Sequence, residues 1–212
     1  MTLQDGRTRR ERRRARTRAA IVDAAIDLFE TRGYDATTVA DIAEAADIGT
    51  RTFFGYFASK DELLFPEVDA RVLATIDAIA TRSPDDRPAD VLLRALGRVV
   101  DASHDLTARS ARLRMRLIQT VPAVRGRALQ LQLDAQREIA RHLLTAYPDE
   151  LNEITAGALV GAFVGAISGA VQAMIDAGGP TSTKTLQMAV WQAADVALRP
   201  WQTSKRCRAG SG

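Results

Sequence analysis

The stretch "TRTFFGYFASK", residues 50–60, places four aromatic side chains within five positions of a chain that is only 5% aromatic. Phe53 and Phe57 are four residues apart, so they share one face if the segment is helical. We expect these two rings to fill the core of a small domain. Phe54 and Tyr56 then point away from that core, toward whatever the domain binds.

The residues on the amino-terminal side of this stretch predict two more helices. Apolar residues recur at helical spacing from about Thr17 to Arg32, which predicts the first helix. Thr37 or Thr38 can cap a short second helix. A break at residues 47–49 then leads into the aromatic stretch. Two short helices that are joined by a tight turn and held by a longer one are the plan of a helix-turn-helix unit, whose second short helix enters the DNA major groove.

The remainder of the chain also predicts helices. Ser59 and Glu62 form a capping-box pattern that starts another helix, which Pro66 should bend. No alternating strand pattern is present. Turn residues divide the carboxy-terminal two thirds of the chain at four places: 83–88, 120–126, 146–150 and 177–182. The sequence therefore predicts an all-α protein with a helix-turn-helix domain at residues 17–65, a larger helical bundle at 66–200 and a disordered tail at 201–212.

Positive charge is concentrated at the amino-terminal end. The formal net charge is only +3, yet residues 1–18 hold eight arginines against two acidic residues. We expect a disordered basic arm at residues 1–16 that follows DNA phosphates or enters a minor groove, with a solvated leader as the alternative. The arm lacks the apolar segment of a signal peptide, and the one cysteine, Cys207, has no disulfide partner in the chain. These features predict a cytoplasmic protein.

One uncharged segment, residues 154–175, is long enough to span a bilayer. It is rich in Ala and Gly, and neither flank carries an aromatic belt or a basic cluster, so we expect a buried helix of a soluble protein with no membrane contact. Its glycines recur every four residues along one face, which suits close approach of a second helix. We place a contact between subunits ahead of packing within one subunit. The glycines are Gly157, Gly161, Gly165 and Gly169.

The segment "TTVADIAEAADIGTRTFFGYFASKDELL", residues 37–64, resembles the DNA-binding region of TetR-type transcriptional regulators. The similarity covers roughly residues 17–65 and extends to the order and spacing of the motif. Two positions depart from the family pattern. Phe54 stands where a tyrosine is usual, and Asp47 replaces the common turn glycine.

The resemblance implies a role for each matching residue. Phosphate contacts are implied for Thr38, Tyr56 and Lys60, and base contacts for Thr50 and Arg51. Thr52 either touches DNA or caps and packs the helix. Gly55 either allows close approach of the backbone to DNA or is merely tolerated. Among the amino-terminal arginines, the expected DNA contacts are Arg16, at the end of the basic arm, and Arg18, just after it.

The resemblance also implies a homodimer whose last two helices, here residues 151–177 and 182–199, pack against their mates. The implied interface consists of the four glycines named above together with Leu186 and Val190. An effector pocket is implied in the larger domain, and the stretch "RMRLIQTVPAVRGR", residues 114–127, resembles the corresponding region of members that respond to acyl-CoA. The candidate ligand-binding residues are Arg112, Arg116 and Gln119, with a solvated face as the alternative.

The sequence thus predicts a homodimeric regulator, a repressor in preference to an activator, that binds a palindromic operator and is released by a small molecule. We expect no cofactor and no metal site, and the two histidines, His104 and His142, are isolated. The chain lacks the common catalytic motifs, so an all-α enzyme is the weaker alternative. A ligand-binding helical dimer whose DNA-binding head is weakened is the other alternative.

Overall fold

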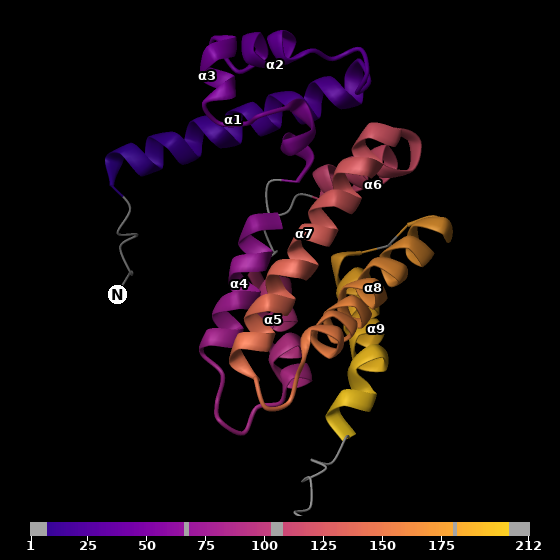
Figure 1. Ribbon diagram of the computed structural model, residues 1–212. Coiled ribbons are helices and arrows are strands. Elements are labelled where there is room, and N and C mark those ends of the chain that lie inside the picture. Colours follow the sequence, from indigo (N-terminus) through magenta and orange to yellow (C-terminus); the bar gives the residue numbers. More distant parts are fainter. Residues whose placement is uncertain (1–7, 66–67, 103–107, 180–181, 204–212) are drawn as a thin grey trace, which may run out of the picture. The chain divides into compact units, whose positions relative to one another are not determined.

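The computed structural model describes residues 8–65, 68–102, 108–179 and 182–203. All regular structure in these ranges is helical, which confirms the predicted all-α class (Figure 1). η1 is a short 3₁₀ helix, and the other elements are α-helices. In chain order they are α1 (Arg9–Thr31), α2 (Val39–Ala45), α3 (Thr50–Phe54), η1 (Lys60–Leu64), α4 (Val68–Ala80), α5 (Pro88–Ala102), α6 (Ala108–Thr120), α7 (Pro122–Ala146), α8 (Glu153–Asp176) and α9 (Thr183–Thr203).

The chain folds as two compact units, and the boundary differs from the prediction. The first unit comprises residues 1–66 and 109–127, and the second comprises 67–108 and 128–212. The sequence predicts that residues 66–200 all belong to the second domain. α6 and the first turn of α7 belong to the first unit because Leu113, Leu117 and Val124 are buried in its core.

The core of the first unit forms where α1, α2, α3 and η1 meet. Phe53 is fully buried and Phe57 is 3% exposed, so the two aromatic residues predicted to fill the core do so. Their rings are 5.9 Å apart between centroids. Burial of one such ring stabilises the fold by roughly 1.5–3 kcal/mol. These contacts fix α3 against α1 and α2.

α1 begins at Arg9, well before its predicted start at about Thr17. Thr8 caps it, because the Thr8 hydroxyl accepts a hydrogen bond from the Glu11 amide (3.3 Å) and the Glu11 carboxylate accepts one from the Thr8 amide (2.7 Å). The prediction of a disordered arm is therefore wrong for residues 9–16. Apolar periodicity cannot reveal this part of the helix, which is built from arginines of high helix propensity. Residues 1–7 lie outside the described ranges.

The segment after α3 also differs from the prediction. The predicted capping box is absent, since the Ser59 side chain makes no capping hydrogen bond and the Glu62 carboxylate accepts from the Ala58 amide (2.8 Å). η1 ends at Leu64, so the predicted helix does not continue to a bend at Pro66, which itself lies outside the described residues.

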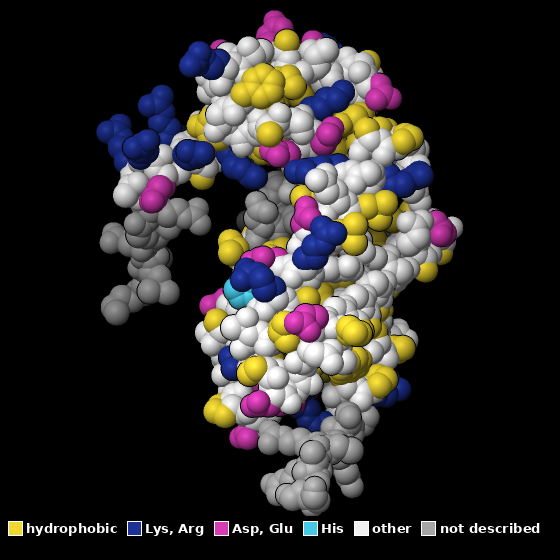
Figure 2. Space-filling view, in the orientation of Figure 1, with side chains coloured by type: hydrophobic (Ala, Val, Ile, Leu, Met, Phe, Trp, Pro, Cys, Tyr) yellow, Lys and Arg dark blue, Asp and Glu magenta, His cyan; other side chains and the backbone are white. Residues whose placement is uncertain are grey.

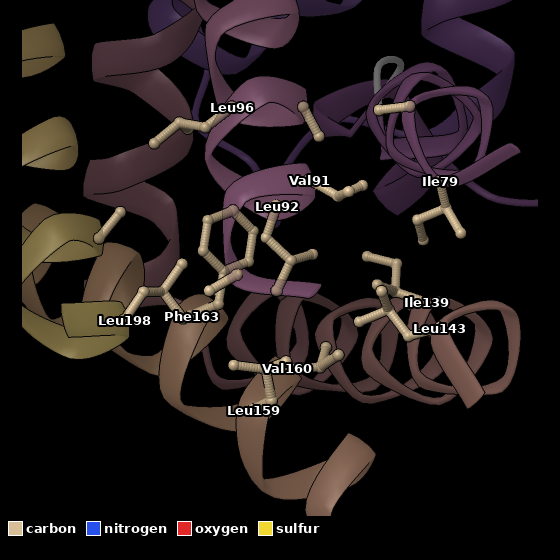
Figure 3. Packing of buried hydrophobic residues seen from close by; sticks show 14 of the residues in the cluster. Ile79, Val91, Leu92, Leu96, Ile139, Leu143, Leu159, Val160, Phe163 and Leu198 are labelled. Carbon is tan, nitrogen blue, oxygen red and sulfur yellow. The ribbon is translucent and has the colours of Figure 1, made fainter. Parts of the chain in front are cut away.

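The second unit is a bundle in which α4 packs along α5, and α9 packs along both α5 and α8. Figure 3 shows its core, where side chains from α5, α7, α8 and α9 meet. Leu92, Leu143, Leu159 and Leu198 are fully buried there. The predicted last two helices, 151–177 and 182–199, correspond to α8 and α9. The predicted break at 120–126 shrinks to Val121 because Pro122 can begin a helix.

Candidate nucleic-acid interface

α2 begins at Thr38 with a complete capping box. The Thr38 hydroxyl accepts from the Asp41 amide (3.2 Å), and the Asp41 carboxylate accepts from the Thr38 amide (2.8 Å) and from the Thr38 hydroxyl. These hydrogen bonds lower the pKa of Asp41, and the Arg32 guanidinium lowers it further. The structure therefore gives Thr38 a capping role, and its implied phosphate contact stays a prediction.

A tight turn joins α2 to α3. Asp47 has a φ of +53°, in the left-handed region that glycine adopts most readily and aspartate tolerates. The Ile48 amide donates to the Ala43 carbonyl (2.9 Å) and the Asp47 amide to the Glu44 carbonyl (3.0 Å), so the turn is closed by backbone hydrogen bonds. The turn of the helix-turn-helix unit therefore forms with aspartate at the position where the TetR-type pattern has glycine.

α3 presents one exposed face. Thr50, Arg51 and Thr52 are all exposed, whereas Phe53 on the opposite side is fully buried. Phe54 is 58% exposed, and its ring meets that of Phe53 edge-on at 5.5 Å between centroids. The structure therefore places Thr50 and Arg51, the two residues with implied base contacts, together with Thr52 on the outward side of a helix that is anchored from within.

The aromatic stretch continues beyond the helix, which ends at Phe54. Tyr56 and Phe57 follow in the turn, although we predicted the whole block to be helical. Each carries an arginine of α1 over its ring: the Arg14 guanidinium lies 5.4 Å from the Tyr56 centroid, and that of Arg18 lies 4.9 Å from the Phe57 centroid. These two cation–π contacts join α1 to the end of α3. Neither pairing can be seen in the sequence, because the partners are far apart along the chain.

Gly55 caps the end of α3 with a φ of −75°, a conformation open to any residue. A Cβ atom at this position meets the carbonyl oxygen of Thr52 at 3.1 Å. A side chain at this position would therefore require a shift of a few tenths of an ångström, and close approach to DNA stays a prediction.

Lys60, for which a phosphate contact is implied and stays a prediction, has structural partners within the first unit. Its ammonium donates to the carbonyls of Tyr34 (2.8 Å) and Thr37 (2.9 Å) and lies 4.3 Å from the centroid of the Tyr34 ring. The Tyr34 hydroxyl in turn donates to Asp61, and burial together with that hydrogen bond raises the pKa of Tyr34. Lys60 therefore ties η1 to the segment before α2.

The candidate ligand-binding residues Arg112, Arg116 and Gln119 lie exposed on α6. The same helix buries Leu113 and Leu117 in the first unit, so these candidates belong to that unit and not to the predicted larger domain. Further arginines, which the sequence analysis did not single out, fix α6. Arg109 pairs with Asp27 (2.7 Å) and Glu30 (2.6 Å) of α1, and Arg114 donates to the Leu64 carbonyl (3.1 Å).

The glycine stripe of α8 is open. A Cβ atom built on Gly157, Gly161, Gly165 or Gly169 meets no other atom within 4 Å. In the described part of the chain these glycines therefore do not pack against another element of the same subunit, which was the alternative that the sequence left open. Two of the predicted interface residues contact the subunit's own core, since Val190 is only 8% exposed and the partly buried Leu186 packs against that core; their contact with a second subunit stays a prediction. α9 instead exposes Met188 and Val196, at 55% and 61%.

By length and composition α8 is the one described helix that could cross a membrane, with a mean hydropathy of 1.9 over an 18-residue window. Only 22% of that window is buried inside the subunit, so the expectation of a buried helix holds for one face alone. That face contributes Leu159, Val160 and Phe163 to the core of the second unit.

Among the described residues, no group of three or more His, Cys, Asp or Glu side chains is placed to hold a metal ion. His142 lies 3.2 Å from Glu138 on the same helix. His104 and Cys207 lie outside the described residues.

The α2–turn–α3 geometry with an exposed polar face on α3 defines a helix-turn-helix protein. Residues 21–65, which include α2, α3 and η1, match the family model described as "Bacterial regulatory proteins, tetR family".

The chain is 32% identical over 137 residues to the HTH-type transcriptional regulator TcmR of Streptomyces glaucescens, a match that covers 62% of this chain and 61% of that protein. It is also 32% identical over 133 residues to a putative mycofactocin biosynthesis transcriptional regulator, MftR, of Mycobacterium tuberculosis, covering 61% of this chain and 65% of that protein. The chain thus matches less than two thirds of the length of either relative. A transcriptional regulator from Aquifex aeolicus has a similar fold, with a TM-score of 0.51 and 17% identity over 85% of this chain and 98% of that one.

Proposed function

We propose that this protein is a homodimeric transcriptional regulator of the cytoplasm that represses genes by binding a palindromic operator and is released by a small molecule. The observation that carries this proposal is the outward face of α3, where Thr50, Arg51 and Thr52 are exposed on a helix held by the buried Phe53. The match of residues 21–65 to the TetR family model and the curated relatives named as transcriptional regulators support it.

Arg51 is the residue proposed to read sequence. It lies near the start of α3 and is exposed, and no hydrogen bond or ion pair within the described residues engages its guanidinium. A guanidinium can donate two parallel hydrogen bonds to O6 and N7 of guanine in the major groove. Thr50 and Thr52 lie on either side of Arg51 in the sequence and are proposed to contact neighbouring base edges or phosphates. Tyr56 is half-buried at the end of the same segment, where its hydroxyl can contact a phosphate.

Dimerisation is proposed to use the open stripe of α8 together with the exposed side of α9. Four glycines with free space above them let a second backbone approach closely, and Ile154, which is 81% exposed, extends the apolar surface at one end of α8. A two-fold dimer presents two copies of α3 and therefore requires two half-sites of inverted sequence, with centres about one helical turn apart or slightly more.

The effector is proposed to be an anionic amphipathic molecule such as an acyl-CoA. Arg112 and Arg116 are four residues apart on the exposed side of α6, while Leu113 and Leu117 bind the opposite side to the DNA-reading unit. A ligand on these arginines can change DNA affinity only if it binds the two states of the protein with different affinities. Calorimetric titration with acyl-CoA, using Arg112→Gln/Arg116→Gln as the comparison, tests this part of the proposal.

The DNA-reading role is tested with Arg51→Ala. Operator sequences are first selected from a random duplex library, and the affinity of each variant for the selected duplex is then measured. Loss of the guanidinium should cost about 1–3 kcal/mol of binding and relax the preference at one base pair in each half-site. Arg137→Ala, which removes an exposed arginine of α7 in the second unit, is the matched control. Equal affinities of Arg51→Ala and the wild type for the operator would contradict the proposal.

A further inference from the structure

The first turns of α1 carry seven arginines that fall into two stripes. Because helical residues three and four apart share a face, Arg10, Arg14 and Arg18 line one side of the helix. A second set follows the spacing i, i+3, i+4 and i+7 and lines another side. This set, called here the arginine ridge, consists of Arg9, Arg12, Arg13 and Arg16. Figure 2 shows Lys and Arg side chains gathered around the projecting end of α1.

The first stripe holds the helix against the DNA-reading segment. Arg14 stacks on Tyr56 at 5.4 Å and Arg18 on Phe57 at 4.9 Å, and Phe57 is itself buried in the core. The first buried residue of α1 is Ile21, so the earlier turns have no apolar attachment and depend on these ring contacts. The direction in which the ridge points is therefore set by Tyr56 and Phe57, the two rings that follow α3.

The arginine ridge itself is exposed at all four positions. None of the hydrogen bonds, ion pairs or ring contacts within the described residues involves these four side chains. The one acidic residue of the described turns, Glu11, is occupied with the cap of the helix through the Thr8 amide (2.7 Å). The ridge is thus a preformed row of positive charge to which no acidic side chain of the described residues is paired.

We propose that the arginine ridge binds the phosphate backbone of duplex DNA beside the half-site that α3 reads. An α-helix with its side chains is about 10–12 Å across, and the minor groove is only about 6 Å wide. Residues 9–16 therefore cannot enter that groove as an extended arm does, and they contact the phosphates along its edge. This inference rests on the proposed function, because Tyr56, against which the arm is stacked, is one of the proposed phosphate contacts.

Such contacts release counterions and carry no sequence information. The ridge should therefore strengthen binding to every duplex by a similar factor and extend the protected footprint beyond each half-site. A ridge that is already helical needs no folding step when it binds.

The test is the variant R9Q/R12Q/R13Q/R16Q, because glutamine keeps helix propensity while removing the charge. The control R98Q/R137Q/R141Q/R199Q removes the same number of charges from the second unit. Affinity for the selected operator and for a random-sequence duplex is measured from low to high salt, with circular dichroism as a check on folding. We expect the log–log salt slope of the ridge variant to fall by about 0.9 for each phosphate that the ridge no longer neutralises, with the control unchanged.

Modified duplexes then locate the contact. Methylphosphonate groups in the flanks neutralise single phosphates and should weaken binding by the wild type but not by the ridge variant. Inosine in place of flanking guanine removes the minor-groove amino group and should have no effect on either protein.

An unchanged salt slope in the ridge variant would overturn the inference, and so would sensitivity of the wild type to flanking inosine. Tight binding by the ridge to RNA but not to duplex DNA would overturn it as well. Suppose that the wild type selects an operator, that Arg51→Ala loses affinity for it, and that the ridge variant binds with the same affinity and salt slope as the wild type. In that case only this inference fails, and the proposed function stands. If the wild type selects no sequence, the proposed function fails.

Discussion

Replacing Gly165 of α8 by alanine should have opposite effects on the subunit and on the dimer. In the single subunit the added methyl group meets no atom within 4 Å. Alanine within a helix is favoured over glycine by about 0.5–1 kcal/mol, so an isolated subunit should become slightly more stable. At a closely packed dimer interface, by contrast, an added methyl group costs about 1–3 kcal/mol.

A two-fold interface contains the position twice, so the cost per dimer is about 2–6 kcal/mol. Its lower end raises the dimer dissociation constant about thirty-fold. Sedimentation equilibrium over a range of concentrations measures this constant directly. Gly126→Ala provides the matched control, because that glycine also has free space around it but lies in the first unit.

Gly165→Leu should give a larger effect in the same direction. If Gly165→Ala and Gly165→Leu both dimerise as the wild type does, the open stripe of α8 is not the contact surface, and the proposed arrangement of two DNA-reading heads loses its basis.

Three further predictions concern the first unit. Phe53→Ala should destabilise the protein by about 3–5 kcal/mol, because the Phe53 ring is fully buried, whereas Phe54→Ala at the exposed neighbouring position should leave the thermal midpoint almost unchanged. Comparable losses of stability in the two variants would contradict the assignment of Phe53 to the core and Phe54 to the surface. Asp47→Gly should raise the midpoint of chemical denaturation, because it relieves a φ of +53°, and a lower midpoint would show that the aspartate side chain has a stabilising role of its own. Hydrogen bonds from Thr38 lower the pKa of Asp41 in the folded state, so the stabilisation that the carboxylate provides is present above the unfolded pKa of about 3.9 and is lost as the pH falls through the lower folded pKa. The free energy of unfolding, measured from pH 6 to pH 2, should therefore depend less steeply on pH in Asp41→Asn than in the wild type. Equal slopes would contradict this.

The helix-turn-helix core could be predicted because local spacing determines it. Phe53 and Phe57 share a face in any helical conformation, and Thr38 precedes a run that needs a cap. Both signals lie within a few residues, and so the sequence alone shows them. The open glycine stripe likewise arises from a four-residue repeat within one helix.

The errors arise where contacts join residues that are far apart in the chain. Arg109 reaches α1 through Asp27 and Glu30, and these long-range pairs help to place α6 in the first unit. The hydrogen bonds of Lys60 to the carbonyls of Tyr34 and Thr37, in the segment before α2, likewise join residues that are far apart in the chain and that local spacing does not connect. The helical start of α1 was missed because arginine supplies helix propensity without apolar periodicity.

The central claim is that two copies of α3 read inverted half-sites, and the most direct measurement is to sequence the genomic DNA fragments that the purified protein retains. The account predicts that the retained fragments share an inverted repeat whose half-site centres are about one helical turn apart or slightly more, and that Arg51→Ala loses this enrichment. Retention of fragments without a common sequence, or enrichment that persists unchanged in Arg51→Ala, would contradict it.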